Sequence, residues 1–84
     1  MSDAMKLVGD IEKKVNGNPM PLMMVLDPAQ VSLALSVFAA AKNNSVDLVD
    51  KTAKALATSM QPFQRLRLVA ILGEDIVTRL EALR

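Results

Sequence analysis

The chain of 84 residues contains no cysteine, no histidine, no tryptophan and no tyrosine. Without cysteine there is no disulfide framework, no thiolate nucleophile and no metal site built on thiolates. Without histidine the chain lacks the commonest general base and metal ligand of proteins. No carboxylates, amines or hydroxyls at catalytic spacing replace them. We therefore expect a protein that is not an enzyme and that carries no metal or other cofactor.

Aromatic residues are nearly absent, since Phe38 and Phe63 are the only two. The core must then consist of leucine, valine, isoleucine, alanine and methionine, which are compatible with helices. Hydrophobic residues make up 51% of the sequence, yet a domain of this length buries only about 60 to 65% of its unfolded surface. Because such a monomer is marginal on its own, we expect a homo-oligomer, with a dimer favoured.

The net charge and the length of the hydrophobic runs indicate which partners and which cellular location to expect. The net charge of +1 is far from the basic excess that drives nucleic-acid binding. The N-terminus lacks the pattern of a signal peptide, so we expect a cytoplasmic location. The longest charge-free run, residues 28 to 41, is 14 residues long, which is short of the roughly 20 needed to span a bilayer. We expect no membrane span.

Hydrophobic periodicity predicts an all-α single domain, residues 1 to 84, built as a small bundle of four helices. The first helix, about 3 to 15, has Ser2 or Asp3 as its cap. Asn16-Gly17-Asn18-Pro19 ends it. The third, about 45 to 60, is amphipathic, and Pro62 interrupts its pattern.

The second helix, about 28 to 42, has the clearest start signal of the chain. Asp27 is suited to cap it, Pro28 fits its first position, and Gln30 completes a capping box. Apolar residues occupy nearly its whole circumference, which predicts a helix that is buried on all sides. Its small residues form a stripe along which another helix can approach closely: Ala29, Ser32, Ser36 and Ala39 or Ala40.

The last helix is predicted to run from about 62 to 83. Its apolar residues follow the alternating spacing of three and four that a coiled-coil seam has. Gly73 lies within this seam, either as an interior glycine or as a cap that splits the segment in two. We favour one helix because the seam keeps its phase across Gly73. The seam consists of Leu66, Val69, Ile76, Leu80 and Leu83.

A Met-rich apolar connector, residues 19 to 27, joins the first two helices. Its apolar side chains are contiguous instead of periodic, so two interpretations stay open. The connector packs across the core of its own chain, or it forms a contact surface in which flexible methionines adapt to a partner. The side chains concerned are Met20, Leu22, Met23, Met24, Val25 and Leu26.

These observations favour a non-catalytic protein-protein interaction module, a self-associating small helical adaptor or regulator of a partner protein. The expected interface combines the connector with the seam of the last helix: Met20, Leu22, Met23, Met24, Val25, Leu26, Leu66, Val69, Ile76, Leu80 and Leu83.

The alternative is a small DNA-binding regulator with a helix-turn-helix-like unit at residues 49 to 69. Ala53, Ala57 and Phe63 lie at compatible spacing for packing the two helices of such a unit. Ala57 replaces the usual turn glycine and Pro62 falls inside the unit, which argues against it. The residues available to contact base edges are Gln61, Gln64, Arg65 and Arg67.

Overall fold

The structure is a computed structural model that describes residues 2–84, which form six helices and no strand. The predicted all-α class is therefore confirmed, whereas the prediction of four helices is wrong. The helices are α1 (Asp3–Lys14), α2 (Met20–Met23), α3 (Pro28–Lys42), α4 (Val46–Ser59), α5 (Pro62–Leu72) and α6 (Glu74–Glu81).

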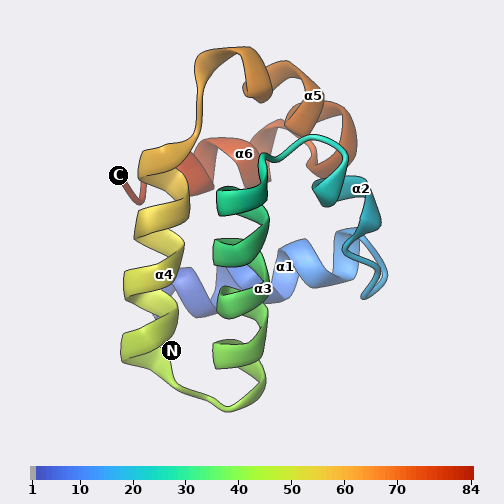
Figure 1. Cartoon of the computed structure of the whole chain (residues 1–84). Coiled ribbons are helices and arrows are strands. Elements are labelled where there is room, and N and C mark those ends of the chain that lie inside the picture. Colours follow the sequence, from blue (N-terminus) through green and yellow to red (C-terminus); the bar gives the residue numbers. More distant parts are fainter. Residues whose placement is uncertain (1) are drawn as a thin grey trace.

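The helices form two layers (Figure 1). In one layer α3 and α4 lie side by side as an antiparallel pair, the most extensive contact between any two helices. Behind them, α1 runs across both helices, and α5 and α6 complete the second layer. The short helix α2 packs against both α3 and α5, so it bridges the two layers at one edge.

The predicted start of α3 is confirmed in atomic detail. The Asp27 carboxylate accepts a hydrogen bond from the backbone N–H of Gln30 at 2.8 Å, and the Gln30 side chain accepts one from the backbone N–H of Asp27 at 3.0 Å. This reciprocal pair is a capping box. At the start of α1, the Ser2 hydroxyl accepts from the backbone N–H of Met5. Local sequence signals thus position both helices.

Gly73 ends α5 and separates it from α6, so the expectation of one helix over 62 to 83 is wrong. Its backbone lies at φ 89° and ψ 155°, a region that is essentially restricted to glycine. Glu74 and Asp75 follow at once, and acidic side chains in a first turn interact favourably with the helix dipole. The two short helices fold back on each other. The heptad spacing therefore arises from two helices that each contribute to the core.

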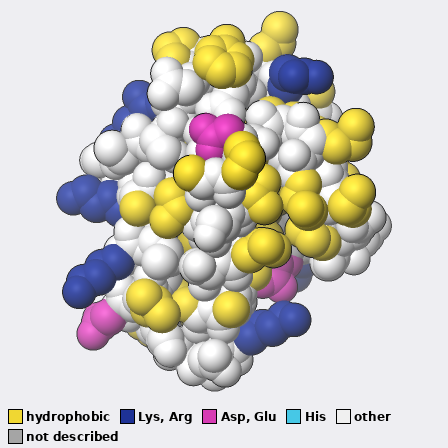
Figure 2. Space-filling view, in the orientation of Figure 1, with side chains coloured by type: hydrophobic (Ala, Val, Ile, Leu, Met, Phe, Trp, Pro, Cys, Tyr) yellow, Lys and Arg dark blue, Asp and Glu magenta, His cyan; other side chains and the backbone are white. Residues whose placement is uncertain are grey.

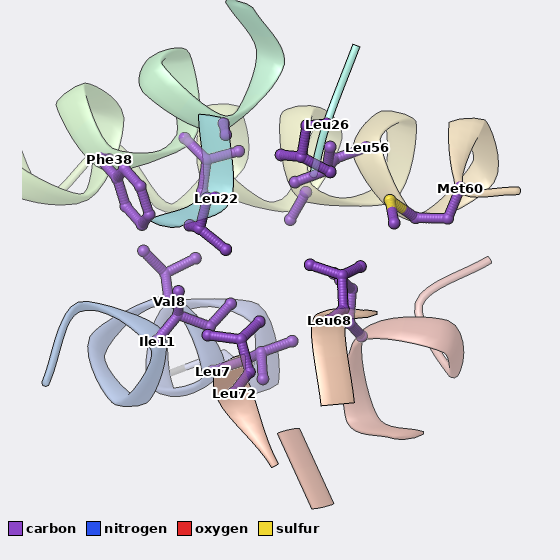
Figure 3. A pocket seen from close by; sticks show the side chains of 14 residues that line it. Leu7, Val8, Ile11, Leu22, Leu26, Phe38, Leu56, Met60, Leu68 and Leu72 are labelled. Atoms are coloured by element: carbon purple, nitrogen blue, oxygen red, sulfur yellow. The ribbon is translucent and has the colours of Figure 1, made fainter. Parts of the chain in front are cut away.

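The core fills the space between the two layers (Figure 3). Side chains from α2, α3 and α4 point towards those of α1 and α5 across this space. A cavity of about 30 Å³ remains at its centre, and an apolar cavity of this kind stays dry. Its lining includes Leu7, Val8, Ile11, Leu22, Leu26, Phe38, Leu56, Met60, Leu68 and Leu72.

The expectation that α3 is buried on all sides is also wrong. Its inner face, which includes Ala34, Val37 and Ala40, is buried. With only two layers, no helix covers its outer face. That face is exposed and consists of Ala29, Ser32, Leu35, Ser36 and Ala39. In residues 2–84, no helix has the length and hydrophobicity that crossing a membrane requires.

Candidate protein-interaction surfaces

The connector has one face in the core and one face in solvent. Leu22 and Leu26 are buried and belong to the main hydrophobic cluster, and Val25 packs against that cluster. The three methionines point outwards, with exposures of 55% for Met20, 41% for Met23 and 78% for Met24. Packing of the connector across the core of its own chain therefore holds for Leu22, Val25 and Leu26, whereas a contact surface formed by the three exposed methionines stays a prediction.

An apolar groove lies between α2 and α3, beside one of the exposed methionines. Met23 lines this groove together with Val31, Leu35 and Phe38, and Leu35 is 46% exposed. We define the α2–α3 surface as the four exposed side chains Met20, Met23, Met24 and Leu35. Sequence reasoning missed Leu35, although it stands beside the small-residue stripe that was identified.

A shallow hollow of about 360 Å³ continues the groove towards the end of α1. It is lined by apolar residues and by two charged ones. They are Leu35, Phe38, Ala39 and Lys42 of α3, Glu12 of α1, and Val15, Gly17 and Pro19 of the segment between α1 and α2. Figure 2 shows hydrophobic side chains gathered over α2 and the adjoining side of α3. Lys and Arg side chains lie along the α4 edge, near α5 and below this group. The four side chains of the α2–α3 surface are thus apolar, and charged side chains lie around them.

A second apolar surface lies on α5. Phe63 and Leu66 are 75% and 80% exposed, and Arg67 and Ala70 are exposed at positions that share their helix face. We call these four residues the α5 surface. The remaining members of the predicted seam lie deeper: Val69 and Leu83 are half-buried, and Ile76 and Leu80 are buried in the core.

The residues of the DNA-binding alternative do not form one exposed group. Gln64 is buried, and both ends of its amide are engaged inside the protein. Arg65 donates to both carboxylate oxygens of Glu81 at 3.1 and 3.0 Å. Gln61 and Arg67 are exposed. Two of the four side chains are thus held by the protein's own structure.

The packing expected of a helix-turn-helix unit is absent as well. Phe63, assigned to lock its two helices together, is largely exposed. Within residues 2–84, the backbone of α5 lies close to α1, α2 and α6 but not to α4, whose side chains meet those of α5 only across the core.

Ion pairs link α6 to α1 within the second layer. Arg79 of α6 donates to Asp10 of α1 at 2.9 Å and lies 3.5 Å from Asp75. The hydrogen bond to Asp10 raises the pKa of the Arg79 guanidinium, and Asp75 contributes further. A raised basic pKa stabilises the fold at every pH below the unfolded value. Because that value is far above neutrality, no pH dependence near pH 7 follows from it.

No group of three or more carboxylates is placed to hold a metal ion in the part of the chain that the structure describes. Comparison of the chain with protein-family models, with curated proteins and with solved structures gives no match.

Proposed function

We propose that the protein is a non-catalytic interaction module that self-associates through the α2–α3 surface and presents the α5 surface to a second protein, as a small adaptor or regulator. The observation that supports this proposal is the position of the exposed large hydrophobic side chains. Within residues 2–84, six of the eight lie on α2, α3 and α5 or, for Met24, directly after α2, and the other two, Val46 and Leu48, lie on α4.

Scattered exposed hydrophobic residues are ordinary, but a contiguous apolar patch on a small protein is typical of an interface. Full burial of one large apolar side chain contributes about 1.5 to 3 kcal/mol relative to exposure. The side chains of the α2–α3 surface are partly to largely exposed, so covering them in a dimer recovers part of this free energy. A domain with so small a core gains most from such a contact.

The composition of the α2–α3 surface suits protein recognition. Three of its four side chains are methionines, whose flexible and polarizable thioethers adapt to the shape of a partner. One of them, Met23, lines a groove whose walls include Leu22, Leu26 and Ala34 of the hydrophobic core. Part of the surface is therefore rigid and part of it is adaptable.

The α5 surface differs in that it carries a positive charge. Phe63 and Leu66 lie beside Arg67 on one helix face, and phenylalanine and arginine are both enriched at protein interfaces. A partner with an apolar segment and an adjacent carboxylate would match this arrangement. We assign the α5 surface to such a partner and the α2–α3 surface, which has no charge, to self-association.

Light scattering tests the proposal. At about 100 µM, well above the Kd of a micromolar complex, we expect the unmodified protein to have the mass of a dimer. The double variant Met23→Ser with Leu35→Ser should have the mass of a monomer and unchanged helicity. Leu48→Ser is the matched control, because Leu48 is 50% exposed on α4 and belongs to neither surface, and this variant should stay dimeric.

The double variant Phe63→Ser with Leu66→Ser separates the two surfaces. It should remain a dimer, because the α5 surface is assigned to another protein. A monomeric unmodified protein contradicts the self-association. A monomeric α5 variant with an intact fold places Phe63 and Leu66 in the self-interface and contradicts the division between the two surfaces.

A further inference from the structure

We propose that the second copy packs antiparallel along α3, about a two-fold axis, with Asp27 of each copy next to Lys42 of the other. This inference rests on the proposed self-association and assigns its geometry. It follows from three features of α3: the groove at its side, the absence of charge along its outer face, and the opposite charges at its two ends.

The outer face of α3 is uncharged along its length. The helix spans 15 residues, and no charged residue occurs between Asp27 and Lys42. Leu35 lies at the middle of the helix and borders the groove against α2. A neighbouring helix can therefore lie along the whole face without burying a charge, which is the costly part of most helix contacts.

The ends of this face carry opposite charges. Asp27 precedes the first residue of α3, and Lys42 is the last; both are exposed. Among residues 2–84, neither takes part in an ion pair within 4.0 Å. Lys42 lines the same hollow as Glu12, but no ion pair joins the two within 4.0 Å. The ammonium group of Lys42 is therefore available to a carboxylate of a second copy.

Charge determines the direction of pairing. An antiparallel arrangement places Asp27 beside Lys42 of the second copy at both ends. A parallel arrangement places Asp27 beside Asp27 and Lys42 beside Lys42, which is repulsive. The helix dipoles favour the same choice, since antiparallel helices bring the positive end of one close to the negative end of the other.

A two-fold axis also brings the apolar grooves together. When the axis is perpendicular to both helices, it reverses the direction of α3 but leaves α2 on the same side of the pair. Leu35 and Met23 of one copy then lie next to Leu35 and Met23 of the other. One apolar cluster forms at the centre of the interface, which is where the residues that dominate binding are usually found.

The small side chains of the outer face set the register. Alanine and serine allow two helices to approach at the lower end of the usual range of about 8 to 10 Å. One register pairs the small residues with each other: it places Ala29 opposite Ala39 of the second copy and Ser32 opposite Ser36. In this register Asp27 lies within reach of Lys42.

Because the chain has no cysteine, single engineered thiols report this register directly. A disulfide needs Cβ atoms within about 4.5 Å of each other. On mild oxidation, a mixture of Ala29→Cys and Ala39→Cys should give a cross-linked dimer containing one copy of each. Each variant alone should cross-link at least about tenfold less, since equal residues lie at opposite ends of an antiparallel pair.

The two outcomes that contradict the inference differ from those that contradict self-association. Efficient cross-linking of Ala29→Cys with itself shows a parallel pair. A dimer whose mixed variants do not cross-link places the second copy elsewhere. In both cases the proposed self-association stands and the antiparallel arrangement fails, whereas a monomer by light scattering contradicts both.

A charge cycle gives a second, independent measurement. Asp27→Asn keeps a residue that caps helices well but removes the charge, and Lys42→Gln removes the opposite one. Either change alone abolishes both ion pairs, so each should weaken the dimer by about two- to thirtyfold, the range for two exposed pairs. The double variant should be no weaker than either single variant.

Lys51→Gln on α4 is the matched control for the loss of one positive charge, and it should leave the dimer affinity unchanged. If the effects of Asp27→Asn and Lys42→Gln instead add in the double variant, the two residues act separately, and the ion pair between copies is contradicted. An affinity that none of these variants changes contradicts it equally.

Discussion

Gln30 and Gln64 exchange two amide hydrogen bonds in the interior of the protein. The Gln30 Nε2 donates to the Gln64 Oε1 at 2.9 Å, and the Gln64 Nε2 donates to the Gln30 Oε1 at 2.6 Å. Each glutamine also accepts from a backbone N–H at the start of its own helix, that of Asp27 or of Gln61. The first turns of α3 and α5 are thereby joined.

The network continues into the backbone on both sides. Gln30 Nε2 donates to the carbonyl of Ser59 at 2.9 Å, and Gln64 Nε2 donates to the carbonyl of Val25 at 3.3 Å. No buried side-chain nitrogen or oxygen within residues 2–84 is left without a partner. A buried polar network of this kind stabilises a fold only while it is fully satisfied.

Replacing one glutamine should therefore be costly. Gln64→Leu leaves the Gln30 amide, the Gln61 N–H and the Val25 carbonyl short of a partner, and a buried unsatisfied group costs about 1 to 3 kcal/mol. We expect the free energy of unfolding to fall by at least about that amount, measured by urea denaturation. Arg67→Leu, at an exposed position of the same helix, is the control and should change it by less than about 0.5 kcal/mol, since arginine and leucine have similar helix propensity.

The double variant Gln30→Leu with Gln64→Leu tests the direct contact. If the two amides interact as described, the loss in the double variant should be smaller than the sum of the two single losses, by about 0.5 to 3 kcal/mol. Strict additivity would show that the two side chains act independently.

The sequence predicted the capping box at Asp27 but not the link between the two glutamines. Capping depends on residues three positions apart, so it can be recognised in a short window. The bond from Gln30 to Gln64 joins residues 34 positions apart and depends on where α5 lies. For the same reason Gln64 was assigned to an exposed DNA-contacting group, although it is buried.

Loss of the cap on α3 should be measurable. Asp27→Ala removes the acceptor of the Gln30 N–H bond and leaves the core untouched, so we expect a loss of about 1 kcal/mol in the free energy of unfolding. Thermal denaturation measures it, with Asp27→Ser as the variant that retains a cap. An Asp27→Ala midpoint equal to that of the unmodified protein contradicts the role of Asp27.

Gly73 shows why helix boundaries were predicted less well near the C-terminus. Hydrophobic spacing on both sides of Gly73 keeps one phase, so periodicity alone favours a continuous helix. The backbone instead turns, because two short helices that fold onto each other bury Leu72, Ile76 and Leu80 in one cluster. Packing over the whole chain outweighs the local pattern.

The sign of the stability change in one variant distinguishes a helix that ends at Gly73 from a continuous helix. Gly73→Ala forces an alanine into a backbone region with positive φ, at a cost of about 1 to 3 kcal/mol. No atom lies within 4 Å of the added Cβ, so the cost is that of the backbone alone. In a continuous helix the same change would stabilise the protein by about 1 kcal/mol. Urea denaturation measures whether the free energy of unfolding falls or rises.

Gly9→Ala is the matched control. Gly9 lies inside α1, is exposed, and also has no atom within 4 Å of an added Cβ. Alanine there should stabilise the protein by about 0.5 to 1 kcal/mol. Opposite signs at the two glycines support the break at Gly73; stabilisation at both contradicts it.

The candidate surfaces were predicted only in part, for a reason that lies in α2. A helix of four residues is too short to show a periodic pattern, so the sequence does not separate its inner from its outer side chains. Leu35 was missed because the hydrophobic residues around α3 indicated complete burial. That inference fails in a fold of two layers, in which α3 has no neighbour on one side.

Truncation of a side chain should lower the free energy of unfolding on the buried face of the connector and leave it nearly unchanged on the exposed face. Leu26 is 9% exposed and lines the central cavity, so Leu26→Ala should lower the free energy of unfolding by about 2 to 5 kcal/mol. Met24 is 78% exposed, and Met24→Ala should change it by less than about 0.5 kcal/mol. Both values are to be measured by urea denaturation at concentrations low enough to keep the protein monomeric. A large loss of stability in Met24→Ala would show that the Met24 side chain belongs to the core. A negligible loss in Leu26→Ala would show that this part of the connector does not belong to it.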